Sequence, residues 1–347
     1  MKNIITRRNF IRLSGATGAS LLFNARKSES TEQPLNRTSQ TSIINQKKTS
    51  KIPIILDTDI GGDIDDAWAL ALILKSPEFD IKMVVTDNGN PIYRGAITGK
   101  YLEAAGRENI PIGLGIEDGV IHPPGPQQSW LGDYQLSDYP GKVHEDGVGE
   151  MINLIMNSQE PITVICTGPV PNIQAALERE PGIVKNTKIV GMFGSLRYGY
   201  DGNEVIVNET NVRLDPDACR QMFNSFSDVT ITPLDTCGIV QLKGSNYQKV
   251  HNSDDPLIKA LIESYYSWSE YVDWTQAYPR VESSTLFDTV AVYLALSEEY
   301  LEIENLGIKV TNDGYTIIDK YEKVIRCATK WKDLPAFEDW LVNRLTS

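Results

Sequence analysis

The chain has 347 residues, of which 41% are hydrophobic and 23% are charged, with 26 glycines and 18 prolines. This is ordinary globular composition, and it excludes a collagen, a coiled coil and a wholly disordered chain. The net charge is −13, and because residues 1–50 hold nine Lys and Arg against two Glu, the remaining residues carry −20. Such an acidic body repels phosphate backbones, so nucleic acid is not an expected partner.

The first 26 residues have the pattern of an export signal. They read MKNIITRRNFIRLSGATGASLLFNAR, in which Arg7 and Arg8 precede Phe10 and a short apolar stretch. This pattern is typical of a twin-arginine signal. The apolar stretch, 13–23, is much shorter than the roughly 20 residues of a membrane-spanning helix. We expect a periplasmic or secreted protein, and an uncleaved signal that tethers it to a membrane remains open.

Residues 27–50 are rich in Ser, Thr, Asn and Gln and hold few large apolar side chains. Such a segment cannot bury enough surface to offset the entropy of ordering it, so we predict a disordered linker. One domain, 51–347, is predicted to follow. The four cysteines are far apart in the sequence and form no C-x-x-C pair. This spacing excludes an ordinary zinc site and predicts buried free thiols.

Short apolar runs alternate with helical patterns from residue 51 onward. The predicted strands are 52–56, 81–86, 162–166, 188–192 and 229–232, and the predicted helices are 65–75, 96–105 and 173–178. This alternation predicts an α/β fold with a mostly parallel sheet flanked by helices. Ligands bind beyond the carboxyl ends of such strands, so we expect the site in the loops after residues 56, 85, 166 and 192.

The segment 113–149 is rich in Gly and Pro and contains Trp130. It is long for a connection without secondary structure, and we predict that it is a lid or a binding loop.

Five aspartates fall within ten residues directly after the first predicted strand, in the segment DTDIGGDIDDA at 57–67. Carboxylates this close repel one another unless a cation or protons neutralise them. Ligands that are all oxygen favour Ca²⁺ or Mg²⁺. We therefore interpret the segment as a site for a hard cation rather than as an acidic helix cap. An EF-hand is excluded, because the twelfth position counted from Asp57 is Trp68 and not Glu.

These residues alone leave several functions open. Asp57 and Asp59 have the spacing of a haloacid-dehalogenase-type phosphatase, with Asp57 as nucleophile. A nucleoside hydrolase would use the same aspartates to hold a metal ion. A periplasmic protein that binds a riboside or a sugar without turnover is the third possibility.

Seven motifs, in order along 51–347, resemble those of the inosine–uridine-preferring nucleoside hydrolase family. DTDIGGDIDDAWAL resembles D-x-D-P-G-x-D-D-A-x-A-L, with Ile60 in place of Pro and two extra residues before Asp65. The other six motifs are VTDNGN, VHEDGVG, TGPVPNIQAAL, GMFGS, GNEVIVNETNVRLDPDA and LFDTVAV. The resemblance implies a Rossmann-like fold and Ca²⁺-dependent hydrolysis of a small riboside to ribose and free base. It also makes a homodimer or a homotetramer possible.

The resemblance also implies a role for individual residues. The Ca²⁺ ligands would be the carboxylates of Asp59, Asp66 and Asp288 and the backbone carbonyl of Pro171, and Asp59 would take a proton from the attacking water. The ribose and the reacting centre would be contacted by Asp65, Asn90, His144, Asn203, Glu209 and Asn211. Surrounding carboxylates suit the positive charge that grows on the sugar when its glycosidic bond breaks.

One position departs from the family pattern. Phe287 occupies the place of a His that, in several family members, protonates the leaving base. His144, Tyr198 and Tyr200 are the candidates for this missing acid. Alternatively, Trp130 would stack on a purine and favour its protonation by solvent. Phe287 itself would line the base pocket.

Asp63 belongs to the two-residue insertion and has no counterpart in the family pattern. We expect it to support the metal ligands without touching the ion.

Overall fold

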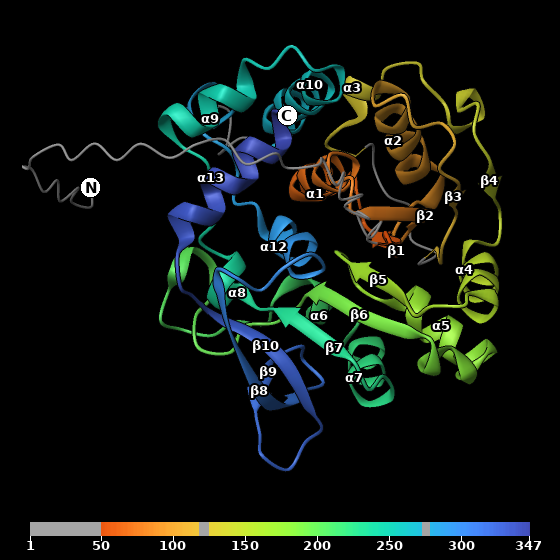
Figure 1. The fold of residues 1–347 in the computed structure, drawn as a ribbon, viewed down its shortest axis with the longest axis vertical. Helices are drawn as coiled ribbons and strands as arrows, with labels where there is room; N and C mark the ends of the chain where they lie inside the picture. Colours follow the sequence, from red (N-terminus) through yellow and green to blue (C-terminus); the bar gives the residue numbers. More distant parts are fainter. Residues whose placement is uncertain (1–49, 118–124, 273–277) are drawn as a thin grey trace, which may run out of the picture. The chain divides into compact units, whose positions relative to one another are not determined.

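The computed structural model describes residues 50–117, 125–272 and 278–347 (Figure 1). The predicted signal, and the predicted linker up to residue 49, lie outside the described residues. None of the described helices is long and apolar enough to cross a membrane.

A ten-stranded sheet forms the centre of the described structure, in the order β4-β3-β2-β1-β5-β6-β7-β10-β8-β9. The strands are β1 (Ile52–Thr58), β2 (Phe79–Thr86), β3 (Ile112–Gly113), β4 (Val143–His144), β5 (Ile162–Cys166), β6 (Thr187–Met192), β7 (Val229–Thr232), β8 (Leu301–Val310), β9 (Thr316–Ile318) and β10 (Val324–Trp331). Neighbouring strands from β4 to β10 are parallel, whereas β8 is antiparallel to β10 and β9. The predicted α/β fold with a mostly parallel sheet is confirmed.

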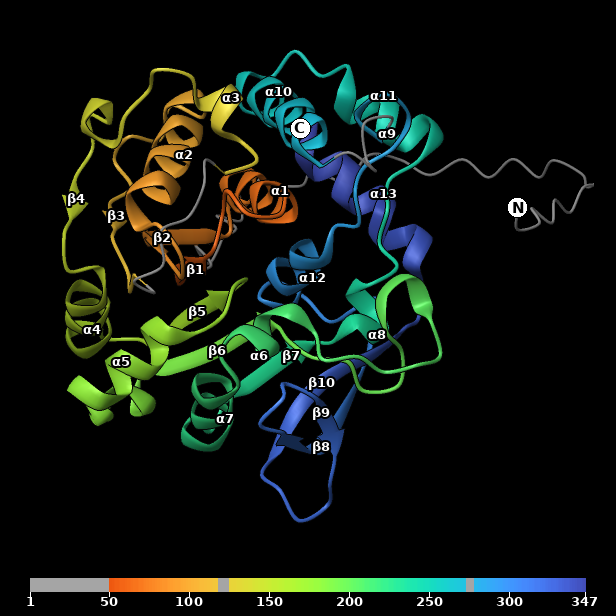
Figure 2. The same ribbon diagram turned by 180° about the vertical axis from the view of Figure 1, so that it is seen from behind.

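Helices cover both faces of the sheet (Figures 1 and 2). The helices are α1 (Asp65–Leu74), α2 (Pro91–Ala104), α3 (Gln128–Leu131), α4 (Gly147–Asn157), α5 (Pro171–Arg179), α6 (Thr210–Leu214), α7 (Pro216–Ser225), α8 (Leu234–Cys237), α9 (Gly244–His251), α10 (Pro256–Tyr271), α11 (Tyr278–Val281), α12 (Phe287–Leu294) and α13 (Leu334–Leu345). Three short 3₁₀ helices are η1 (Leu136–Asp138), η2 (Pro181–Lys185) and η3 (Tyr200–Gly202).

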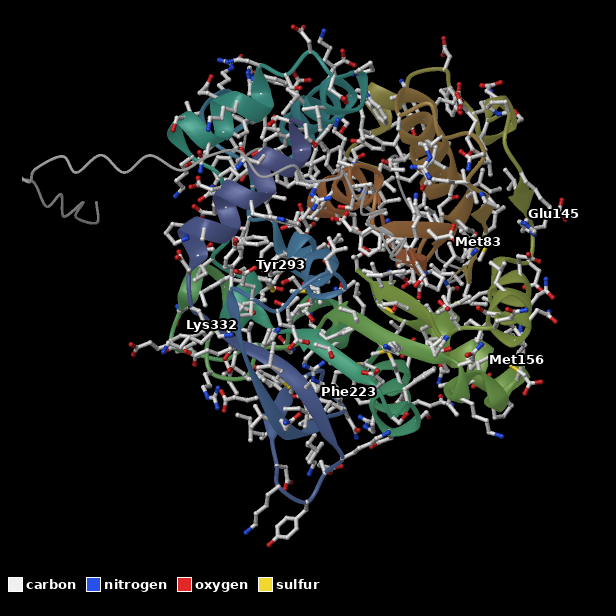
Figure 3. The ribbon with its side chains drawn as sticks, in the orientation of Figure 1. Met83, Glu145, Met156, Phe223, Tyr293 and Lys332 are labelled. Carbon is white, nitrogen blue, oxygen red and sulfur yellow. The ribbon has the colours of Figure 1, made fainter. Side chains whose placement is uncertain are left out.

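The sheet separates two hydrophobic cores, and β1 contributes to both. Ile54 and Leu56 face the core formed with α1, α2, α10, α12 and α13, whereas Ile55 faces the core formed with α4, α5 and α7. This alternation follows from the two-residue period of side chains along a strand. In Figure 3, Tyr293 belongs to the first core, and Met83 and Phe223 belong to the second.

The sequence located β1, β2, β5, β6 and β7 but missed the short strands β3 and β4 and the carboxyl-terminal strands β8, β9 and β10. The segment 113–149, which we predicted to be a lid or a binding loop, contains α3, η1, β4 and the start of α4 among its described residues. All four cysteines are buried free thiols, as predicted.

The order of the strands determines where the site lies. β1, β5 and β6 are adjacent and parallel, so their carboxyl ends meet at one edge of the sheet. The loops that follow them bring together segments that are far apart in the sequence.

Candidate active site

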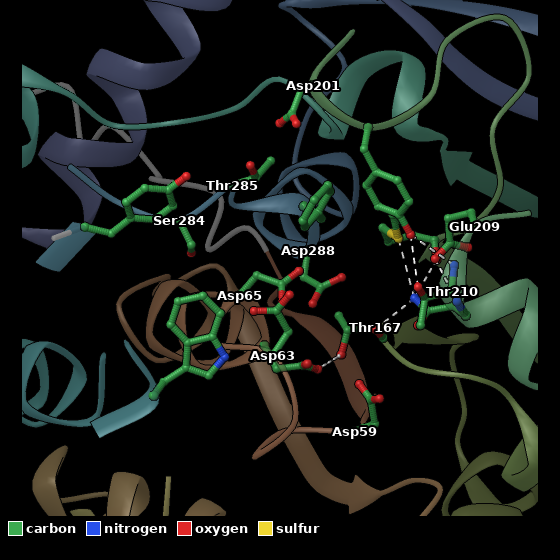
Figure 4. Close-up of a pocket in the computed structure, with 17 residues that line it drawn as sticks. Asp59, Asp63, Asp65, Thr167, Asp201, Glu209, Thr210, Ser284, Thr285 and Asp288 are labelled. Carbon is green, nitrogen blue, oxygen red and sulfur yellow. Dashed lines mark hydrogen bonds between the residues drawn. The ribbon is translucent and has the colours of Figure 1, made fainter. Parts of the chain in front are cut away.

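A cavity of about 450 Å³ lies at the carboxyl ends of β1, β5 and β6 (Figure 4). It is lined by Asp59, Asp63, Asp65, Asp66, Thr167, Met192, Tyr200, Asp201, Glu209, Thr210, Asn211, Trp268, Tyr278, Ser284, Thr285, Phe287 and Asp288. Three of the four loops predicted from the sequence contribute to this lining. The described residues of the loop after β2 do not.

Three buried carboxylates converge in this cavity. Asp65 and Asp66 lie in the first turn of α1, and Asp288 lies in the first turn of α12. One oxygen of each lies within 4.8 Å of the others, so the three could hold a metal ion. Helix N-termini stabilise negative charge. Burial and mutual repulsion nevertheless raise the pKa of all three well above the ordinary value in the absence of a cation.

Two hydroxyl groups hold the central carboxylate of this cluster in position. Thr58, the last residue of β1, donates a hydrogen bond of 2.6 Å to Oδ1 of Asp66. Thr167, which follows β5, donates one of 2.7 Å to the same oxygen. The ends of two neighbouring strands therefore orient Asp66.

Asp59 lies in the same cavity but outside the close cluster of three. Its carboxylate is partly exposed, and Oδ2 lies 3.9 Å from Nη2 of Arg94. In Figure 4, Asp59 and Asp288 are on opposite sides of Thr167. Asp65, which the resemblance assigned to ribose, is thus the third member of the close cluster, and the assignment of Asp59 as a metal ligand stays a prediction.

Pro171 is not among the residues that line the cavity. It is the first residue of α5 and is absent from the lining, whereas Thr167, four residues earlier, is part of it. The assignment of the Pro171 backbone carbonyl as a metal ligand therefore stays a prediction. Thr167 is the residue of the TGPVPN turn that reaches the site.

Glu209 and Asn211, which are predicted to bind ribose, line the wall of the cavity formed by α6 and the residue before it. Glu209 caps α6 by accepting hydrogen bonds from the backbone N–H groups of Asn211 and Val212, at 2.7 and 3.3 Å. It also accepts one from Gly194 at 3.0 Å. Burial nevertheless raises its pKa to about 7. The Asn211 amide donates to the carbonyl of Thr167 at 3.1 Å, so the two walls are linked.

The loop that carries Tyr200 and Asp201 is fixed by distant residues. Asp235 accepts hydrogen bonds of 2.9 Å from the backbone of Leu196 and Arg197. The Thr316 hydroxyl, on β9, accepts a hydrogen bond of 2.9 Å from the Ser195 N–H and donates one of 3.1 Å to the Ser195 carbonyl.

Aromatic side chains line another part of the cavity. Phe287 and Tyr200 pack edge to face, with ring centroids 5.8 Å apart. The Tyr200 hydroxyl accepts a hydrogen bond of 3.2 Å from the Thr210 N–H and shares one of 3.0 Å with the Thr210 hydroxyl. Burial raises the pKa of Tyr200, which makes it a weaker acid than a free tyrosine. Phe287 and Tyr200 therefore lie where the sequence placed them, but Tyr200 is poorly suited to protonate a leaving group.

Two predicted asparagines lie outside the cavity. Asn90 is exposed and caps α2 by accepting hydrogen bonds from the backbone of Ile92 and Tyr93. Asn203 is exposed and accepts a hydrogen bond from the backbone of Val205. The side chains of Asn90 and Asn203 therefore stabilise the local backbone at these positions.

Three predicted residues with aromatic or imidazole side chains are also absent from the lining of the cavity. His144 is on the edge strand β4, and its Nδ1 lies 3.6 Å from the Glu150 carboxylate. Trp130 packs against the ring of Tyr101, with centroids 4.7 Å apart. Tyr198 is 41% exposed and does not line the cavity.

Several lining residues were missed by the sequence analysis. These are Thr167, Met192, Asp201, Thr210, Trp268, Tyr278, Ser284 and Thr285. Trp268 lies within a helix of mixed character, so its spacing gave no sign of a site. Asp201 follows a candidate residue directly and could have been noted for that reason.

Asp57 is fully buried and does not line the cavity. Its Oδ1 accepts a hydrogen bond of 2.7 Å from the Asn172 amide. A side chain without access to the cavity cannot attack a substrate there, so the geometry gives no support to the phosphatase interpretation.

The α/β fold places converging carboxylates at the strand ends, in a cavity of the size that binds a small molecule. The model of the family described as "Inosine-uridine preferring nucleoside hydrolase" matches residues 54–339, and the chain belongs to this family. It is therefore an N-glycosyl hydrolase of the nucleoside hydrolase type.

Curated relatives agree with this assignment. The pyrimidine-specific ribonucleoside hydrolase RihA of Photobacterium profundum is 27% identical over 293 residues, 78% of this chain and 89% of the relative. The non-specific ribonucleoside hydrolase RihC of Klebsiella pneumoniae is 28% identical over 229 residues, 63% of this chain and 74% of the relative.

Solved structures show the same fold. A plant nucleoside hydrolase, the PpNRh1 enzyme, has a TM-score of 0.69 at 22% identity, over 85% of this chain and 99% of that one. A purine-preferring ribonucleoside hydrolase from Gardnerella vaginalis has a TM-score of 0.68 at 24% identity, over 85% of this chain and 98% of that one.

The raised pKa of Glu209 predicts how stability depends on pH. Because the folded state holds a proton on this group up to about pH 7 and the unfolded state releases it at the lower, ordinary pKa, deprotonation favours unfolding. In the presence of chelator, we expect this contribution to stability to be lost as the pH rises from 5 to 8. Urea unfolding of the wild type and of Glu209→Gln measures it. A pH dependence that is no shallower in Glu209→Gln would contradict the assignment.

Proposed function

We propose that the protein hydrolyses the N-glycosidic bond of ribonucleosides or related N-ribosides in a Ca²⁺-dependent reaction that gives ribose and a free base. The observation that carries this proposal is the convergence of Asp65, Asp66 and Asp288 in a cavity large enough for a nucleoside.

The donor set fits a hard cation. All three side chains offer carboxylate oxygens, and no described lining residue is a Cys or His, so the site favours Ca²⁺ or Mg²⁺ over zinc. Asp66 and Asp288 would hold the ion, with Asp65 and Asp59 beside them. The backbone carbonyl of Pro171 would complete the donor set. Bound Ca²⁺ would orient the sugar hydroxyls and lower the pKa of a water molecule.

The remaining polar groups would bind the ribose and activate the attacking water molecule. Asp59 is the proposed general base, because it is the carboxylate of this group that remains partly exposed inside the cavity. Glu209 and Asn211 would bind ribose hydroxyls, since backbone contacts hold both in fixed orientations. The surrounding carboxylates would stabilise the positive charge that develops on the sugar.

Removal of one cluster carboxylate tests the metal assignment. We expect Asp66→Ala to abolish Ca²⁺ binding and base release while the protein still folds, because two buried partners remain without the central ligand. Calorimetric Ca²⁺ titration, circular dichroism and a reducing-sugar assay on inosine, uridine and adenosine measure these outcomes. Asp133→Asn, which changes an exposed aspartate outside the cavity, is the control.

Normal cleavage by Asp66→Ala would show that the site is assigned wrongly. Tight riboside binding by the wild type without turnover would favour the binding-protein alternative instead.

Phe287 generates a second prediction. Phe287 lines the cavity next to Asp288, so a histidine at this position would place a proton donor beside the substrate. We expect Phe287→His to raise kcat for inosine, up to the roughly 10²–10⁴-fold that a positioned acid contributes. Phe287→Leu is the matched control, and equal kcat values for the two variants would contradict this role.

We also propose export by the twin-arginine route, on the basis of Arg7, Arg8 and the apolar stretch that follows. Cell fractionation of the full chain and of the Arg7→Lys/Arg8→Lys variant tests it. Retention of only the variant in the cytoplasm is the expected result, and identical fractionation of both would contradict it.

A further inference from the structure

The lining of the cavity is acidic and contains no opposing positive side chain among the residues that the structure describes. Seven lining residues are carboxylic acids, and none of the described ones is Lys, Arg or His; the acids are Asp59, Asp63, Asp65, Asp66, Asp201, Glu209 and Asp288. A divalent cation offsets two negative charges, and the raised pKa values keep protons on some of the buried acids, but Asp201 is exposed and lies apart from them. The cavity therefore favours a positively charged ligand over a neutral ligand of the same shape.

Aromatic side chains strengthen this preference. Tyr200, Trp268, Tyr278 and Phe287 all line the cavity. The faces of aromatic rings attract cations, and Trp does so most strongly. Rings and carboxylates together are the combination that proteins use to recognise organic cations.

Asp201 adds a carboxylate away from the metal cluster. Figure 4 shows Asp201 beyond Thr285, on the side of Asp288 opposite Asp59. Its backbone has φ +58°, a left-handed conformation that Asp tolerates better than most residues. Its side chain is exposed and forms no ion pair with any residue in the described part of the chain. This charge is thus available to a ligand.

The chemistry of the leaving group points in the same direction. A neutral base needs a proton to depart readily, and the described lining offers no His or Lys for this task. A cationic aglycone needs none. When water adds to C1′, the C1′–N bond breaks, its electron pair moves to the ring nitrogen and cancels the positive charge, and one proton of the water is released.

Resting on the hydrolase function proposed above, we propose that the substrates of this site are N-ribosides whose aglycone carries a formal positive charge, and that Asp201 is the residue that selects this charge. Such aglycones are N-alkylated purines and pyridinium rings. The site then combines the sugar contacts of a nucleoside hydrolase with recognition of an organic cation.

A matched pair of substrates tests the inference with the full chain and Ca²⁺ at pH 6. Guanosine and 7-methylguanosine differ by one methyl group and one positive charge. We expect kcat/KM for 7-methylguanosine to exceed that for guanosine by about 10²-fold or more, the rate that a missing acid costs a neutral substrate. Because the charge also weakens the bond without any enzyme, the decisive measurement is the effect of Asp201→Asn.

We expect Asp201→Asn to lower the ratio of the two kcat/KM values by roughly fivefold, mainly through a higher KM for 7-methylguanosine, as for a partly exposed charge pair. Asp133→Asn is the control and should leave the ratio unchanged. A ratio near one in the wild type, or an unchanged ratio in Asp201→Asn, would overturn the inference. A larger loss on guanosine would overturn it as well, because it would make Asp201 a leaving-group acid.

The failure of this inference is distinguishable from failure of the hydrolase function. Turnover of guanosine with equal or better efficiency overturns the charge selectivity alone. No turnover of either substrate overturns both.

Discussion

The repulsion among buried carboxylates is the constraint on which this site depends. Asp65, Asp66 and Asp288 are buried and lie close together, although burial and like charges disfavour ionisation. Two helix N-termini and the hydroxyls of Thr58 and Thr167 offset part of this cost. The remainder is relieved only by protons or by a cation, so a cluster of this kind is built for an ion.

The sequence was sufficient to predict the strands around the site and the position of its acidic cluster. β-rich runs located five parallel strands, and the density of aspartates after the first strand located the acidic centre. Asp288 lies more than two hundred residues from Asp66, and only its motif indicated the pairing. Family resemblance therefore supplied the long-range contact that local patterns cannot show, because periodicity describes one segment at a time.

The differences between the predicted residues and the observed lining of the cavity have a common physical origin. Asn90 and Asn203 match family motifs, but their side chains are used to cap a helix and a turn. His144 also lies in a motif that matches the family, but the structure places it on the edge strand β4. Trp268 and Tyr278 were missed because nothing local separates an aromatic side chain in a core from one in a cavity wall. The side-chain environment is set by tertiary packing, which motif order does not encode.

The hydrogen bonds between Thr316 and Ser195 connect the antiparallel strands to a loop that lines the cavity. β9 belongs to the last section of the chain, yet it clamps the loop that presents Tyr200 and Asp201. During synthesis this loop would acquire its final shape only after the carboxyl-terminal strands have been made. The cavity would therefore be completed late in the synthesis of each chain. A chain that ends before β9 would contain the aspartate cluster but would lack the contacts that fix the loop with Tyr200 and Asp201.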